Sequence, residues 1–150
     1  MSAVTNEQII AYLDRLPADK LVLHGAQKEH KILKPAVPNQ AHLIPEYNQR
    51  AVYGTLFTDI ALVHAVIRSP KTEWGWKFDP EKKPHLFVQG PEFLSIGMGY
   101  IHILKRSDFT QTVEPGLVCL AFQEVVPVRV LRVHPNILEV LHKSKRLQFI

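Results

Sequence analysis

The chain contains 150 residues, of which 46% are hydrophobic and 21% are charged. This composition is typical of a globular domain and excludes wholesale disorder, and the length suits one domain over residues 1–150 with a single core. The formal net charge is +4 and the sequence pI is about 9.3. Such a surplus favours anionic partners such as nucleotides, phosphates or nucleic acid, although a solvated basic surface explains the same charge.

Localisation and metal binding are judged from signals that the sequence lacks. No apolar run approaches the roughly 20 residues of a membrane span, and no basic segment precedes an apolar stretch near Met1. Cys119 is the single cysteine, which excludes an internal disulfide and a multi-cysteine zinc site. The histidines are scattered without HxxxH spacing. We therefore expect a cytoplasmic protein with no membrane partner and no bound metal.

The first third of the chain predicts a helix, a strand and a long irregular segment. Thr5 and Gln8 have the spacing of a capping box, apolar residues follow at helical spacing, and Pro17 ends the helix. Residues 21–24 form a short apolar run that stops at a glycine, which is typical of a buried strand. Residues 26–50 contain three prolines and little periodicity, and long loops of this kind are usually functional or mobile.

The middle of the chain predicts a second strand, a second helix and a second loop. Residues 51–55 are strand-like and contain a glycine. Thr58 or Asp59 is placed to cap a helix that closes at Ser69-Pro70. Residues 70–84 are polar and rich in proline, and we expect them to form a loop that carries both tryptophans.

The last part of the chain is dominated by strand patterns separated by turn signals. We expect strands at 85–89, 99–104, 117–122 and 124–133, followed by a short helix at 136–142. The βαβ alternation that a parallel sheet requires is absent after residue 70, so the order of elements predicts an α+β fold and excludes a Rossmann fold.

Three expected strand ends carry side chains suited to a site. His24 precedes Gly25, where the missing Cβ would let a ligand approach the backbone. Tyr53 and Thr55 flank a glycine at the end of the next strand. Glu124 leads into a β-branched stretch, where an acid must face solvent, be paired or serve a site. Each has an ordinary structural explanation when taken alone, and their combination is what suggests a function.

The combination resembles a known family. The motifs that carry the resemblance, in chain order, are Leu21-Val22-Leu23-His24-Gly25, Ile32-Leu33-Lys34-Pro35, Val52-Tyr53-Gly54-Thr55, Ile60-Ala61-Leu62-Val63-His64-Ala65, Gly99-Tyr100-Ile101-His102-Ile103-Leu104 and Pro127-Val128-Arg129-Val130-Leu131-Arg132-Val133. Over residues 20–133 they resemble the ADP-ribosyltransferase superfamily, in particular its small poly-ADP-ribose-polymerase-like and rifamycin ADP-ribosyltransferase-like domains. The resemblance implies a single α+β domain of split, antiparallel-rich sheets with a few short helices.

The resemblance also implies NAD as a substrate and assigns roles by position. His24 would donate to a ribose hydroxyl, and the backbone of Gly25 would bind the nicotinamide amide. Tyr53 would stack on the nicotinamide ring, with Thr55 on the same wall. Glu124 is the best match by order for the acid that binds the nicotinamide ribose and stabilises an oxocarbenium-like transition state, a contribution of several kcal/mol. The expected catalytic residues are therefore His24, Tyr53 and Glu124.

Some assignments stay open within this resemblance. Gln123 or Glu92 could take the position of the acid, and Trp74, Trp76 or Phe93 could complete the nicotinamide sandwich. We expect His24 and Tyr53 to lie on neighbouring strands, with their side chains opening into one cleft. We also expect Gly25→Val to abolish NAD binding while leaving the fold largely intact.

The implied function is transfer of ADP-ribose from NAD to an acceptor, with release of nicotinamide. The acceptor is unknown and could be a protein, a nucleic acid or a small molecule. One alternative is a non-catalytic module on the same fold that binds a nucleotide or a protein. Another is an enzyme similar to RNA 2′-phosphotransferases, which use arginines in place of the acid; the candidates are Arg50, Arg106, Arg129 and Arg132.

Overall fold

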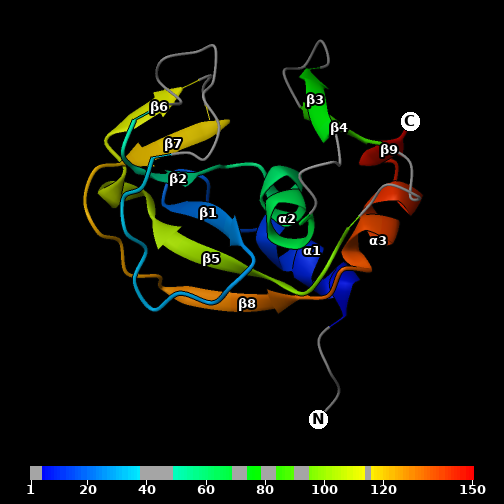
Figure 1. The fold of residues 1–150 in the computed structure, drawn as a ribbon, viewed down its shortest axis with the longest axis horizontal. Coiled ribbons are helices and arrows are strands. Elements are labelled where there is room, and N and C mark those ends of the chain that lie inside the picture. The colour runs from blue at the N-terminus through cyan, green and yellow to red at the C-terminus, as the bar shows by residue number, and fades with distance from the viewer. Residues whose placement is uncertain (1–4, 38–48, 69–73, 79–83, 90–94, 114–115) are drawn as a thin grey trace.

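The computed structural model describes residues 5–37, 49–68, 74–78, 84–89, 95–113 and 116–150. Within these ranges the chain forms three α-helices and three small, mostly antiparallel sheets, which confirms the expected α+β class. Figure 1 shows helix α2 at the centre, with two sheets on one side and the third on the other.

The first two sheets meet at one pair of residues. Strands β1 (Leu21–Ala26), β5 (Gly99–Lys105) and β8 (Arg129–Val133) form the antiparallel sheet β1-β5-β8. Strands β2 (Val52–Gly54), β7 (Val118–Ala121) and β6 (Gln111–Val113) form the antiparallel sheet β2-β7-β6. The backbone N–H groups of Leu23 and Thr55 each donate to the other's carbonyl, at 2.9 and 2.8 Å, and so join β1 to the end of β2.

The third sheet corrects the sequence prediction. It consists of β3 (Trp74–Phe78), β4 (Pro84–Val88) and β9 (Leu147–Phe149), with β4 and β9 parallel. Residues 74–78 therefore belong to a strand, and the expected loop over 70–84 is wrong there. β6 and β9 were not expected either; both are short and are held by pairing with β7 and β4 from other parts of the chain.

The helices follow local signals to different degrees. At the start of α1 (Asn6–Asp14), the Thr5 hydroxyl accepts a hydrogen bond from the backbone N–H of Gln8. The Gln8 side-chain oxygen accepts one from the backbone N–H of Thr5, which confirms the capping box. Helix α2 (Thr58–Val66) is capped by Phe57 without a side-chain bond, so the expected Thr58 or Asp59 cap is wrong. Helix α3 (Ile137–Lys143) is short, and a single 3₁₀ turn, η3 (Arg106–Asp108), follows β5.

Helix α2 packs unusually close to the first sheet. Its residues Ala61 and Ala65 are fully buried. A Cβ on Gly25 would lie 2.0 Å from the Ala61 carbonyl oxygen, and one on Gly99 would lie 2.1 Å from the Ala65 carbonyl oxygen. Glycine at both positions is therefore required for the contact between helix backbone and strand. The contact brings α2 alongside the end of β1, where the cleft described below opens.

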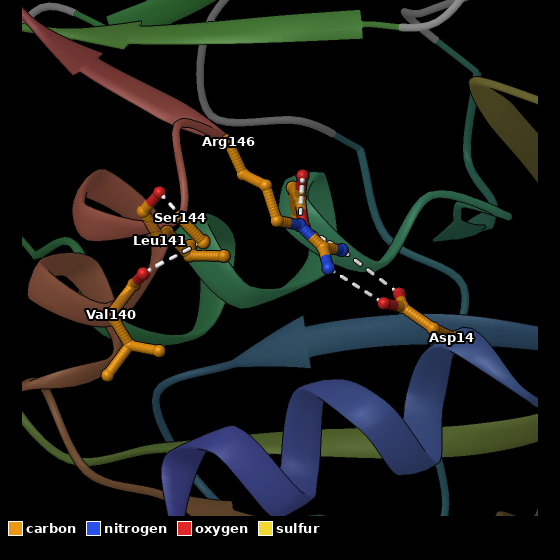
Figure 2. Close-up of polar contacts among 6 residues, drawn as sticks. Asp14, Val140, Leu141, Ser144 and Arg146 are labelled. Atoms are coloured by element: carbon orange, nitrogen blue, oxygen red, sulfur yellow. Dashed lines mark hydrogen bonds and ion pairs between the residues drawn. The ribbon is translucent and has the colours of Figure 1, made fainter.

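A charged cluster fixes the last segment of the chain to two helices. Arg146 lies just before β9, and Figure 2 shows its guanidinium reaching Asp14 at the end of α1. Its Nη1 and Nη2 donate to the two Asp14 oxygens at 2.7 and 3.0 Å. Its Nε and Nη2 donate to Asp59 of α2 at 2.6 to 3.1 Å. One guanidinium thus joins α1, α2 and the edge of the third sheet.

Candidate functional site

A cleft of about 560 Å³ lies where the ends of β1 and β2 face α2 and β3. It is lined by residues from these four elements and from the start of β7: Leu23, His24, Gly25, Tyr53, Gly54, Thr55, Ile60, Ala61, His64, Trp74, Trp76, Leu117 and Val118. The expected site residues on the first two strands therefore come together in one cleft, as predicted for His24 and Tyr53.

His24 is held in one tautomer by its neighbouring strand. Its Nδ1 lies 2.5 Å from the Tyr53 carbonyl oxygen, and because a carbonyl only accepts, Nδ1 carries the proton. Burial lowers the pKa of His24, with a smaller opposing effect from this hydrogen bond. Nε2 makes no hydrogen bond within the described residues and carries a lone pair. The neutral ring can therefore accept a hydrogen bond through Nε2, whereas the resemblance implied a donor.

A second histidine supports His24 from the adjacent strand. His102 lies opposite His24 in the β1–β5 register, and their rings meet edge to face at 5.7 Å. The His102 Nδ1 donates to the His24 carbonyl at 3.3 Å, and its Nε2 accepts from the backbone N–H of His30 at 2.9 Å. Burial, with a smaller effect of the nearby His24, lowers the pKa of His102 to about 4. This neutral, fully buried ring ties β1 and the segment after it to β5.

The buried His102 makes folding sensitive to acid. Because its pKa is about 4 in the folded protein and about 6.5 when unfolded, the unfolded chain binds more protons between these values. The stabilisation is complete above pH 6.5 and is lost as the pH falls toward 4. We expect His102→Gln to remove on the order of 2–3 kcal/mol of this pH dependence, since each pKa unit is about 1.4 kcal/mol.

The measurement is urea unfolding of both proteins from pH 7.5 to 4. Because carboxylates also take up protons in this window, the test is the difference between the unfolding free energies of the two proteins at each pH. If the unfolding free energies of the wild type and His102→Gln fall by the same amount as the pH is lowered, the low pKa of this ring is contradicted.

Tyr53 and Thr55 contribute different surfaces to the cleft. The Tyr53 hydroxyl donates to the Gln49 carbonyl at 2.5 Å, and burial raises the pKa of Tyr53, so the phenol stays protonated at neutral pH. The Thr55 hydroxyl accepts from the Phe57 amide at 3.1 Å and lies 3.4 Å from the Gly116 carbonyl. Thr55 therefore shapes the turn into α2, and its hydroxyl is already engaged by backbone groups.

An aromatic wall faces these strand ends. Trp74 and Trp76 come from β3, with ring centroids 6.0 Å apart, and the His64 ring meets Trp74 edge to face at 4.8 Å. His64 is exposed where it lines the cleft, and the protein atoms packed around it lower its pKa. His64 was missed as a site residue. It lies one turn after Ile60 and is the one polar residue in the apolar stretch from Ile60 to Val66, which was the signal that could have found it.

The remaining expected residues lie elsewhere. Glu124 is exposed in the segment between β7 and β8 and does not line the cleft. The expected strand over 124–133 forms only from Arg129 onward. Gln123 is also exposed, and Glu92 and Phe93 lie outside the described residues. Among the described lining residues there is no carboxylate, so none of the described acids lies with His24 and Tyr53 in the cleft.

Gly25 lines the cleft, but its substitution would act on the fold. Since a Cβ there would overlap the Ala61 carbonyl, the expectation that valine leaves the fold largely intact is wrong.

The candidate arginines do not gather at the cleft: Arg106 donates to the Ala18 carbonyl at 2.5 Å, and Arg129 donates to the Tyr12 hydroxyl at 3.1 Å.

Comparison with known proteins leaves the site to be interpreted from its own residues. No family model, no curated protein and no solved structure matches the chain. The described helices include none long and apolar enough to cross a membrane. In the same part of the chain, no group of three or more His, Cys, Asp or Glu side chains is arranged to hold a metal ion.

Proposed function

We propose that the cleft binds the nicotinamide half of NAD and that the protein transfers ADP-ribose to an acceptor. The observation that carries this proposal is the meeting of His24 and Tyr53, from neighbouring strands, at one cleft. The chain order of these residues resembles the ADP-ribosyltransferase superfamily, and their position in space agrees with that resemblance. We also propose that the domain has the fold of that superfamily.

The cleft residues fit such a ligand. A volume of about 560 Å³ lies within the range of roughly 300–1,000 Å³ that is usual for small-molecule sites. His24 would accept a hydrogen bond from a ribose hydroxyl through Nε2, because its Nδ1 proton is held by the Tyr53 carbonyl. The rings of Tyr53, Trp74 and Trp76 offer flat apolar surface to a nicotinamide ring, since stacking of this kind favours planar groups.

The chain's own residues would act by positioning. Bound NAD would supply a glycosidic bond that breaks to release nicotinamide with the bonding electrons, while the acceptor bonds to the ribose carbon and gives up a proton. The tautomer of His24 is set by Tyr53 and its strand is held by His102, so the accepting Nε2 is fixed before any ligand arrives. Preorganisation of this kind lowers the entropic part of the barrier.

The position of Glu124 favours a second candidate, an NAD- or nucleotide-binding domain that does not transfer ADP-ribose. Glu124 is the acid that the order of motifs suggests, and it is exposed away from the described cleft lining. Both candidates need the same binding residues. They differ in whether nicotinamide is released.

NAD binding and turnover on matched variants test both candidates. We expect NAD to raise the thermal midpoint of the wild type, because a ligand that binds only the native state stabilises it. His24→Ala should weaken NAD binding by about tenfold or more, equivalent to at least ~1.4 kcal/mol. His134→Ala, at an exposed histidine outside the cleft, should bind NAD as the wild type does. Binding is measured by calorimetry and nicotinamide release by chromatography.

Each result separates the candidates. No NAD binding to the wild type would overturn both, and binding without nicotinamide release would leave the binding domain. We expect Glu124→Gln to change the unfolding free energy by less than about 0.5 kcal/mol, as is usual for an exposed side chain, and to leave any turnover unchanged. A loss of turnover with unchanged binding would instead make Glu124 the missing acid.

A further inference from the structure

A second hollow lies away from the NAD cleft, between α1 and strand β8. It has a volume of about 900 Å³, and all four consecutive residues from Arg129 to Arg132 line it. Successive side chains of a strand point to opposite faces of the sheet, so four in a row can line one hollow only if it follows the edge of the strand. We call this hollow the β8 groove. β8 is the last strand of the sheet β1-β5-β8, which leaves this edge unpaired within the described residues.

The hydrogen-bond pattern shows which backbone groups the edge presents. Leu23 of β1 bonds with Thr55 through both its N–H and its C=O, so these groups point away from β5. Backbone direction alternates along each strand of an antiparallel sheet. His24, the residue after Leu23, therefore points its N–H and C=O toward β5, where it pairs with His102. Ile101, next to His102, in turn points toward β8 and pairs with Leu131, so the N–H and C=O of Leu131 point toward β5. The N–H and C=O groups of Val130 and Arg132 consequently point outward into the β8 groove.

The β8 groove is strongly basic. Arg15, which directly follows α1, and Arg129 and Arg132 of β8 line it, and none of its described lining residues is acidic. The Arg129 guanidinium lies 5.0 Å from the centre of the Tyr12 ring and donates to the Tyr12 hydroxyl. The side chains of Arg15 and Arg132 form no ion pair within the described chain. Two guanidinium groups are therefore available to an anionic partner beside an open strand edge.

We infer that the β8 groove binds an extended acidic segment of a partner protein, which pairs with β8 as an additional strand. A peptide matches the alternating donors and acceptors of Val130 and Arg132, and its carboxylates match the arginines. A nucleic acid fits less well, because the phosphates that would meet the arginines only accept hydrogen bonds and give the outward carbonyls of Val130 and Arg132 no donor at the same spacing. A second copy of the chain would bring further arginines to the same short edge, and like charges there are destabilising.

This inference is independent of the proposed function, since none of the cleft residues takes part. The test uses a short fluorescein-labelled peptide of alternating Glu and Val, and the same peptide with Lys in place of Glu. Anisotropy titrations compare the wild type with Arg132→Glu, Val130→Pro and the control Lys143→Glu. The control makes the same change in net charge at an exposed residue of α3 outside the groove.

We expect saturable binding of the Glu peptide to the wild type and to Lys143→Glu, and binding about tenfold or more weaker to Arg132→Glu. Val130→Pro removes an outward N–H, which edge strands tolerate, and should weaken binding at an unchanged thermal midpoint. If Val130→Pro proves unstable, the N-methylated Glu peptide, which lacks matching donors, replaces it and should not bind the wild type.

Several outcomes would overturn the inference. One is no binding of the Glu peptide, and another is equal binding of the Lys peptide. A third is tight binding of a single-stranded oligonucleotide that Val130→Pro leaves unchanged, which would make the groove a nucleic-acid site. A fourth is a dimer in sedimentation that Val130→Pro dissociates, which would make a second copy the occupant.

Discussion

Gly25→Ala is expected to destabilise the protein by about 3 kcal/mol or more, at the upper end of the usual range for overpacking. The added Cβ would lie 2.0 Å from the Ala61 carbonyl oxygen and 2.9 Å from the Ala65 nitrogen. Both are backbone atoms of α2, so no change of rotamer relieves the overlap. The helix must move away from β1, and the close packing of its buried face on the sheet is lost. Valine at this position should be worse still.

The matched control is Gly97→Ala, which makes the same chemical change. The three atoms nearest to a Cβ on Gly97 all belong to the Arg68 side chain, which is exposed and can move if its hydrogen bond to the Met98 carbonyl shifts with it. We expect this variant to lie within about 1 kcal/mol of the wild type, because alanine also reduces the entropy of the unfolded chain. Urea unfolding followed by circular dichroism gives both values. Equal midpoints for Gly25→Ala and Gly97→Ala would refute the close contact between α2 and β1.

Arg146→Met is the second change with a large expected effect, about 2–3 kcal/mol. It leaves Asp14 and Asp59 close together without their shared cation. The hydrogen bonds from Arg146 lower the pKa of Asp14, whereas burial raises the pKa of Asp59, whose side chain is only 15% exposed. Removal of the guanidinium therefore leaves the largely buried Asp59 carboxylate without its cation. The value is below the usual cost of about 3–5 kcal/mol for a broken buried pair, because Asp14 is 39% exposed and solvent screens it.

A double variant separates the lost contact from the stranded charge. Arg146→Met combined with Asp59→Asn should regain part of the loss, since the asparagine carries no charge that needs a partner. Arg146→Lys should be intermediate, because an ammonium group keeps the charge but cannot bond both carboxylates with the geometry of a guanidinium. Unfolding free energies from urea titrations at pH 7 form the cycle. A double variant no more stable than Arg146→Met would show that the Asp59 charge is not the cause.

The sequence by itself determined the elements that rest on local chemistry. The capping box of Thr5 and Gln8 and the apolar spacing after it specify α1, because the bonds that start a helix lie within four residues of each other. The apolar runs of β1 and β5 are long enough to mark buried strands without knowledge of their partners. The two strand-end residues His24 and Tyr53 were also recognisable, because each stands beside a glycine at the end of an apolar run.

Only the tertiary structure decided the features that depend on distant partners. Strand β3 lies in a stretch that is polar and rich in proline, and it exists because β4 pairs with it and β9 pairs with β4 from some 60 residues further along the chain. The order of motifs placed Glu124 beside the site, yet the path of the chain after β7 leaves it exposed. Pairing and packing act across space, and a one-dimensional pattern does not record which segments they join.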